Sequence, residues 1–195
     1  MQQRSDLYTV PADLPVPTDD GACDHLAGKV LPSIPLASTD GEQIDLAALP
    51  GRTLVYIYPR TGRPDQPGSA AWDAIPGARG CTPQSCGFRD HYAELRSLAV
   101  SAVFGLSTQT TDYQREVVER LHLPFPLLSD SALVFTRTLR LPTFEFEPYR
   151  DESPTHLKRM ALVIRDGRIE KVFYPVFPPD RNAADVMEFL ATNPM

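Results

Sequence analysis

The sequence predicts an α/β protein with a central mixed β-sheet flanked by helices on both faces. Apolar strand-like runs alternate with amphipathic helical patterns through the middle of the chain, as expected for parallel strands joined by helices. A hairpin pattern and a closing helix follow near the C-terminus, and they add antiparallel strands. The 195 residues suffice for one sizeable core and predict one main domain.

The N-terminal part of the chain predicts an extension and then a β-hairpin. Residues 1–25 are polar and contain several prolines, so we expect an extension that wraps the main domain, residues 26–195, or remains mobile. Asp40-Gly41 lies between short apolar runs in the segment Ser33–Leu46, which predicts the hairpin. The apolar run Leu54–Tyr58 predicts a buried strand.

A long loop and a helix are expected next. Residues 60–80 are irregular in pattern, and loops of this length are usually functional or mobile. Trp72 is expected to anchor this loop, with substrate contact as the alternative. The helix that follows is predicted with Thr82 as its N-cap and Pro83 in its first position, where a missing N–H costs nothing. Its buried face is predicted to carry Phe88, Tyr92, Leu95 and Leu98.

The second half of the chain alternates strand and helix patterns before it closes with a hairpin and a helix. The expected strands are Ala102–Ser107, a short strand from Leu127, Arg159–Arg165 and Ile169–Val176. The expected helices are Thr111–Leu121, Ser131–Thr138 and a last helix that begins near Asn182 and buries Val186, Phe189 and Leu190. Thr111 and Gln114 predict a capping box, and Asp166-Gly167 predicts the hairpin turn. This order suits a thioredoxin-like fold.

Composition excludes several classes of protein. The net charge of −6 gives no basic surface for nucleic acid. No apolar run approaches the ~20 residues that span a bilayer, and the start of the chain lacks a secretory signal. We therefore expect a soluble, cytoplasmic protein that binds neither nucleic acid nor membrane. Three cysteines are too few for a disulfide scaffold. Cys23 is expected to be a free structural or surface thiol, with intermolecular bridging or an accessory redox role as alternatives.

Cys81 and Cys86 are the residues that point to chemistry. Cys81 lies where the loop is expected to become a helix, and there unpaired N–H groups and the helix dipole favour a thiolate. The thiolate is the nucleophilic form, and Cys86 can trap the product of its oxidation. The alternative is that both cysteines are small buried apolar residues. A metal site with His91 is not expected, because the spacings differ from those of common zinc sites.

The spacing of the pair carries a geometric condition. Residues five apart on a helix are separated by roughly 7.5 Å of rise and about 140° of rotation. Disulfide Cα atoms rarely lie more than about 7 Å apart. We therefore predict that a Cys81–Cys86 disulfide requires the turns from Thr82 to Cys86 to unwind.

The run YPR from Tyr58, followed by GCTPQSCGFRD, closely resembles the peroxiredoxin Q group, also called bacterioferritin comigratory proteins. The resemblance covers residues 30–193. It implies that Cys81 is the peroxidatic cysteine and Cys86 the resolving cysteine. It also implies that Arg159, in KRMALVIRDG, holds the thiolate and polarises the peroxide.

The resemblance implies a thiol-dependent peroxidase that reduces hydrogen peroxide and organic hydroperoxides and needs no metal or organic cofactor. The sulfenic acid on Cys81 would condense with Cys86, and a thioredoxin-type dithiol would reduce the disulfide. Members of the group are often monomers, so we expect a monomer. The alternative is a non-enzymatic redox sensor or binding module on the same fold, with the 60–80 loop as its partner site. A dithiol oxidoreductase is disfavoured because the chain has no CxxC.

The sequence departs from the group at two positions. Members usually carry Pro seven residues before the peroxidatic cysteine and Thr or Ser three residues before it, where this chain has Ala74 and Ala78. If Pro59 is the family proline, the 60–80 loop contains an insertion. Ala78 offers no hydrogen bond to a peroxide, so either Ser69 or Trp72 supplies one or activity is weak. The stretch Phe144–Glu152 is expected to be a solvated loop near the active site or a docking surface for a reductase.

Overall fold

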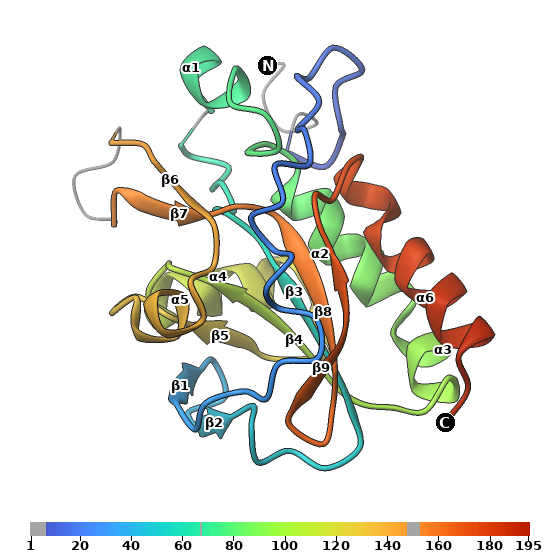
Figure 1. The fold of residues 1–195 in the computed structure, drawn as a ribbon. Helices are drawn as coiled ribbons and strands as arrows, with labels where there is room; N and C mark the ends of the chain where they lie inside the picture. Colours follow the sequence, from blue (N-terminus) through green and yellow to red (C-terminus); the bar gives the residue numbers. More distant parts are fainter. Residues whose placement is uncertain (1–6, 67, 148–152) are drawn as a thin grey trace.

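The computed structural model describes residues 7–66, 68–147 and 153–195, and a seven-stranded sheet lies at its centre (Figure 1). The strands are β1 Pro35–Ser38, β2 Gln43–Asp45, β3 Arg52–Ile57, β4 Val100–Ser107, β5 Leu127–Ser129, β8 Met160–Arg165 and β9 Arg168–Phe173. Their spatial order is β2-β1-β5-β4-β3-β8-β9. The central strands β3, β4 and β5 are parallel and their outer neighbours are antiparallel, which confirms the predicted mixed sheet and both predicted hairpins.

Helices cover both faces of this sheet, as predicted. The helices are α1 Ala70–Asp73, α2 Cys81–Asp90, α3 Tyr92–Ser97, α4 Thr111–Leu121, α5 Val134–Leu139 and α6 Asn182–Thr192, with a 3-10 turn η1 at Pro179–Arg181. Along β3, Leu54 and Tyr56 pack into the core beneath α2, α4 and α6, whereas Val55 and Ile57 pack into the core beneath α5. Within the described ranges, no helix has the length and apolarity needed to cross a membrane.

The predicted N-caps of two helices were wrong, by two residues for α2 and by one for α4, although α4 spans Thr111–Leu121 as predicted. Helix α2 begins at Cys81 and its N-cap is Gly80, so Thr82 is not the cap and Pro83 occupies the third helical position. Gly80 has a φ of 104°, and a Cβ there would lie 2.2 Å from Pro179 Cγ. Only glycine suits this junction, because the backbone is left-handed and η1 lies against it. For α4, the N-cap is Thr110, whose hydroxyl accepts a hydrogen bond from the backbone N–H of Tyr113.

The loop at residues 60–80 is more ordered than its sequence pattern predicts, because it contains α1. Ser69 caps that helix by accepting a hydrogen bond from the Trp72 N–H at 3.1 Å. The Trp72 ring packs against Phe144, Phe146 and His156, with ring centroids 5.1–5.7 Å apart. The prediction that Trp72 anchors the loop is therefore confirmed.

Trp72 packs against a two-stranded sheet that was not predicted from the sequence. It pairs β6 (Thr143–Glu145) with antiparallel β7 (Thr155–Leu157). The stretch expected to be a solvated loop therefore begins as a strand. Phe146 packs against Trp72, and the last part of the stretch, residues 148–152, lies outside the described residues.

The N-terminal segment, drawn in blue in Figure 1, lies along the domain from residue 7 onward. Cys23 is buried, with its sulfur 4.0 Å from the sulfur of Met160, and burial raises the pKa of the Cys23 thiol to about 12. Gly28 N–H donates to Ile169 O and Leu31 N–H donates to Gly167 O, so the chain follows the outer edge of β9. The described part of the extension therefore wraps the domain, and Cys23 is a structural thiol. The boundary at residue 25 stays a prediction.

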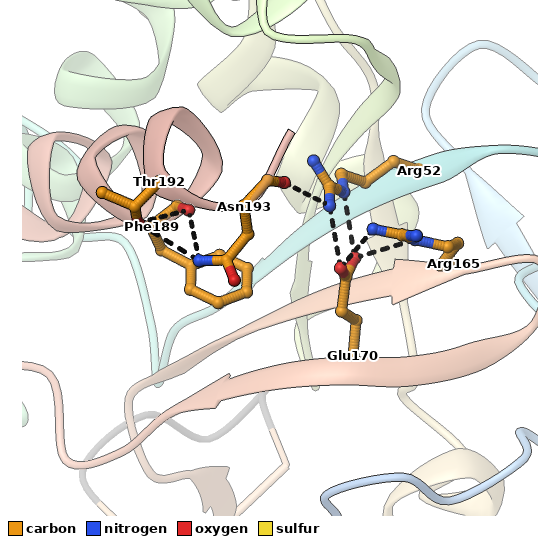
Figure 2. A network of polar contacts seen from close by, with 6 residues as sticks. All are labelled: Arg52, Arg165, Glu170, Phe189, Thr192 and Asn193. Atoms are coloured by element: carbon orange, nitrogen blue, oxygen red, sulfur yellow. Dashed lines mark hydrogen bonds and ion pairs between the residues drawn. The ribbon is translucent and has the colours of Figure 1, made fainter. Parts of the chain in front are cut away.

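An ion-pair network built on the buried Arg52 contacts the C-terminal end of α6 (Figure 2). The Arg52 side chain is fully buried and donates to both carboxylate oxygens of Glu170, at 2.8 and 2.9 Å. Arg165 donates to the same carboxylate, and Arg52 also donates to the carbonyl of Asn193 at 2.9 Å. The network joins β3, β8 and β9 to the residue that ends α6. The position of α6 matters for the site, because its first residue, Asn182, accepts a hydrogen bond from Gln84 near Cys81.

Candidate active site

Cys81 is brought to the end of β3 although 21 residues separate it from Arg60. The backbone N–H of Arg60, which directly follows Pro59, donates to Cys81 Sγ at 3.4 Å. The 60–80 loop therefore leaves the end of β3 and returns to the same place at the start of α2. Cys81 is the first residue of α2, so its sulfur lies at the positive end of the helix dipole. This arrangement supports Pro59 as the counterpart of the family proline.

Arg159 lies against the same sulfur, immediately before β8. Its Nη2 donates to Cys81 Sγ at 3.2 Å, and only 3% of the residue is exposed. Gly77 O accepts from Arg159 Nε at 3.2 Å, and Ala78 O and Arg79 O lie 3.0 and 3.1 Å from the same Nη2 that contacts the sulfur. The loop that precedes α2 thus surrounds the guanidinium with carbonyl oxygens, and the two N–H groups of Nη2 are shared between two of these carbonyls and the Cys81 sulfur. A guanidinium is permanently charged, so Arg159 places a fixed positive charge against this sulfur.

Gln84 and Asn182 hold Arg159 in this orientation, and the sequence analysis missed both. Gln84 Oε1 accepts from Arg159 Nη1 at 2.5 Å, and Gln84 Nε2 donates to Asn182 Oδ1 at 2.9 Å. Both residues are 1% exposed. Gln84 lies three residues after Cys81, and that spacing on a helix was a signal for it. No local signal pointed to Asn182, which arrives from α6, or to the backbone N–H of Arg60.

Cys86 lies on the same unbroken helix as Cys81, and both thiols are free. Helical geometry separates the two residues by roughly 7.5 Å along the axis, so the structure does not bring the two sulfurs together. Cys86 is half-buried, and this burial raises the pKa of its thiol although the charge of Arg89 opposes the shift. Cys86 is thus a protonated thiol at neutral pH in the folded helix.

The segment between the cysteines is held by buried side-chain contacts. Ser85 Oγ accepts a hydrogen bond from the Tyr56 hydroxyl at 3.1 Å, and both residues are fully buried. Gln84 contributes the contacts with Arg159 and Asn182. Unwinding of α2 must therefore break interactions with β3, with α6 and with Arg159 itself.

A small cavity of about 60 Å³ opens beside the Cys81 sulfur. Its lining includes Leu7, Arg60, Trp72, Asp73, Arg79 and Thr82. One water molecule takes about 30 Å³ in the liquid, so the cavity has room for a solute of a few atoms. Because Cys81 is only 3% exposed, this cavity is the approach to its sulfur. Of the two side chains expected to replace the missing Thr or Ser, Trp72 lines the cavity, whereas Ser69 caps α1.

The remaining polar residues of this region form local pairs. His91 contacts Glu94 at 2.5 Å, and Arg89 pairs with Asp90 at 2.8 Å, as expected for a polar helix face. In the part of the chain that the structure describes, no three His, Cys, Asp or Glu side chains gather to hold a metal ion.

Comparison with known proteins gives consistent matches. The model of the redoxin family matches residues 26–187. Peroxiredoxin Bcp of Escherichia coli K12 is 32% identical over 149 residues, which cover 75% of this chain and 84% of that protein. Chloroplastic peroxiredoxin Q of Gentiana triflora is 26% identical over 191 residues, which cover 94% of this chain and 77% of that protein.

Solved structures agree in fold. Peroxidoxin BcpB from Mycobacterium tuberculosis superposes with a TM-score of 0.68 at 21% identity, covering 87% of this chain and 99% of that chain. A mutant of PrxQ from Xylella fastidiosa superposes with a TM-score of 0.65 at 18% identity, covering 85% and 95%. The predicted thioredoxin-like fold is thereby confirmed.

Proposed function

Because the chain belongs to the redoxin family, in its peroxiredoxin Q and Bcp group, it is a thiol-dependent peroxidase, and we propose that Cys81 is its peroxidatic cysteine. The observation that carries this proposal is the pair of N–H donors on the Cys81 sulfur, from Arg60 and Arg159, beside a cavity of peroxide size. Donors fixed in advance stabilise charge without reorganising during the reaction. Peroxides are the substrates, and a thioredoxin-type dithiol is the reductant.

In the first step the Cys81 thiolate attacks one oxygen of the peroxide. An S–O bond forms, the O–O bond breaks, and the leaving oxygen takes a proton to become water or an alcohol. Cys81 is oxidised to the sulfenic acid and the peroxide is reduced. Thr82 lines the cavity and has a side-chain hydroxyl, so we assign it the contact with the peroxide that Ala78 cannot make.

In the second step Cys86 attacks the sulfenic sulfur, an S–S bond forms, and the hydroxyl leaves as water. This step requires α2 to unwind, because the helix holds the two cysteines too far apart. Unwinding also removes Cys86 from its buried position, which lowers its raised pKa and makes the nucleophilic thiolate accessible. The external dithiol then reduces the disulfide, and α2 refolds.

A steady-state assay with hydrogen peroxide, thioredoxin, thioredoxin reductase and NADPH tests the proposal. Cys81→Ser is expected to abolish turnover, and Cys86→Ser to allow one oxidation per molecule and then stop. Cys23→Ser is the matched control and should retain turnover. Mass spectrometry after one equivalent of peroxide should find a Cys81–Cys86 bridge.

Turnover that survives in Cys81→Ser would refute the assignment of Cys81. Oxidation of one equivalent without turnover in the wild type would instead indicate the redox sensor. Location and oligomeric state stay predictions. A cytoplasmic location is tested by cell fractionation, and a monomer by light scattering during gel filtration.

A further inference from the structure

A second cavity, of about 280 Å³, lies next to Arg159 and is separate from the small cavity beside Cys81. Its walls come from the N-terminal extension, the 60–80 loop, β6 and the segment that follows β9. The apolar wall residues are Pro17, Ile75, Pro76, Phe144, Pro175 and Val176. Segments far apart in the sequence thus assemble one apolar chamber.

Asp20 forms hydrogen bonds with two other residues at the opening of this chamber. Its carboxylate accepts from Lys158 Nζ at 2.7 Å and from the Tyr174 hydroxyl at 2.8 Å. The extension is thereby tied to the strands on either side of the opening. The Asp20 carboxylate and the Lys158 ammonium neutralise each other. The third charged group of the lining, the Arg159 guanidinium, already has its own polar partners, so the chamber favours an uncharged ligand. The Ala22 N–H also donates to Asp20, at 3.2 Å, so one of the about four lone-pair positions of the carboxylate remains for a hydrogen bond from a ligand.

Size and chemistry together define the class of ligand. An apolar cavity of about 150 Å³ binds benzene, and this chamber has nearly twice that volume. Ligand sites are mostly apolar and carry a few polar groups that set orientation. We propose that the chamber binds a small uncharged aromatic molecule with one hydrogen-bond donor, of the phenol type, with the ring among the apolar walls and the donor at Asp20.

The chamber shares residues with the support of Cys81. Arg159 is part of its lining, and the Gly77 carbonyl that accepts from Arg159 Nε belongs to the same wall as Ile75. A bound ring therefore contacts the loop that orients the guanidinium on the Cys81 sulfur. Occupancy of the chamber changes the rate at which Cys81 is oxidised, because both depend on the position of Arg159. Binding itself needs no cysteine chemistry and stands apart from the peroxidase function.

The binding test uses the full chain carrying Cys81→Ser, so that it is independent of catalysis. Titration with 4-methylphenol, followed by calorimetry and thermal unfolding, should show saturable binding and a rise in Tm that grows with ligand concentration. Ile75→Phe and Val176→Phe fill the chamber from two sides and should each weaken binding by at least about tenfold. Val134→Phe, at an exposed position on α5, is the matched control and should bind as the parent does. An absence of binding, or equal binding by all variants, overturns the site.

The linkage is tested separately in the wild-type chain. Oxidation of Cys81 by hydrogen peroxide is stopped at intervals with an alkylating reagent and measured by mass spectrometry, with and without saturating 4-methylphenol. The rate constant should change by at least about twofold in the wild type, and it should not respond to 4-methylphenol in Ile75→Phe. An unchanged rate in the saturated wild type overturns the linkage to Cys81.

Discussion

Replacement of Gln84 by leucine should slow the oxidation of Cys81 even though Gln84 does not touch the sulfur. Gln84 accepts from Arg159 Nη1 and donates to Asn182 Oδ1, and all three residues are at most 3% exposed. Leucine has a similar size but no polar atom, so the substitution leaves the guanidinium with a free buried donor. Arg159 then settles among its other partners, and the N–H on the sulfur is no longer fixed.

The magnitudes follow from burial. A hydrogen bond to a charged group contributes about 1.5–3 kcal/mol, and each buried polar atom left without a partner costs about 1–3 kcal/mol. We expect a loss of about 3–5 kcal/mol in the free energy of unfolding. Three carbonyl groups still hold Arg159, so the rate of Cys81 oxidation should fall by roughly tenfold to a hundredfold, less than for outright removal of a transition-state donor.

The rate is measured by stopped flow through the emission of Trp72, the single tryptophan of the chain, which lines the cavity beside Cys81. Gln114→Leu is the matched control. Gln114 is also fully buried and donates to Ser107 Oγ and Leu128 O, but it lies on α4 and has no bond to Arg159 in the described structure. It should lose comparable stability and keep its oxidation rate. A wild-type rate in Gln84→Leu, or an equal loss of rate in both variants, would refute the positioning of Arg159 by Gln84.

Further predictions concern the helix junction, acid stability and thiol reactivity. Gly80→Ala should lower the free energy of unfolding by more than the ~1–2 kcal/mol that a left-handed backbone costs, because the new Cβ would also overlap Pro179. Gly41→Ala is the control, since Gly41 has a similar φ but open space around it, so this variant loses only the backbone contribution. Equal losses in denaturant titrations of the two variants would contradict the clash. Burial would raise the pKa of Glu170, but its two arginine partners outweigh burial and lower it. The stabilisation that ionised Glu170 gives the fold is therefore present above the ordinary pKa of about 4.3 and is lost as the pH falls through the lowered pKa. The Tm of the wild type should drop in acid, and the Tm of Glu170→Gln should drop less. Identical profiles of Tm against pH in the two proteins would remove this explanation. Burial raises the pKa of Cys23 to about 12, so Cys23 should stay unmodified by iodoacetamide at pH 8 while Cys81 reacts. Preferential labelling of Cys23 in a peptide map would show that its burial is not maintained.

The sheet and most helices were predictable because their signals are local. Alternation along Leu54–Tyr58 assigns successive side chains to two cores, and helical spacing in Thr111–Leu121 marks the buried face of α4. The exact start of α2 was not predictable, because Pro179 decides it from almost 100 residues away. Thr82 carries the side chain of a good N-cap, but the left-handed Gly80 next to η1 is the N-cap, so the helix begins two positions earlier.

The site divides in the same way. Cys81 was visible from its place between a loop and a helix, and Arg159 from the family resemblance. The hydrogen bond from Arg60 is made by a backbone amide, which any residue but proline would supply. The amino-acid type at this position therefore could not predict it. Asn182 reaches Gln84 only after α6 has packed against α2. The short β6–β7 sheet was missed for a related reason, since three-residue strands carry too little periodicity to recognise.

The course of the N-terminal segment along β9 has a consequence for aggregation. An unpaired strand edge is a template on which a second chain can add its own strand. Residues 28–31 occupy that position on β9, and β2, at the opposite border of the sheet, has only three residues. The proposed opening of α2 takes place on the helical layer, away from both borders. Opening and refolding of α2 therefore leave both borders of the seven-stranded sheet as they are.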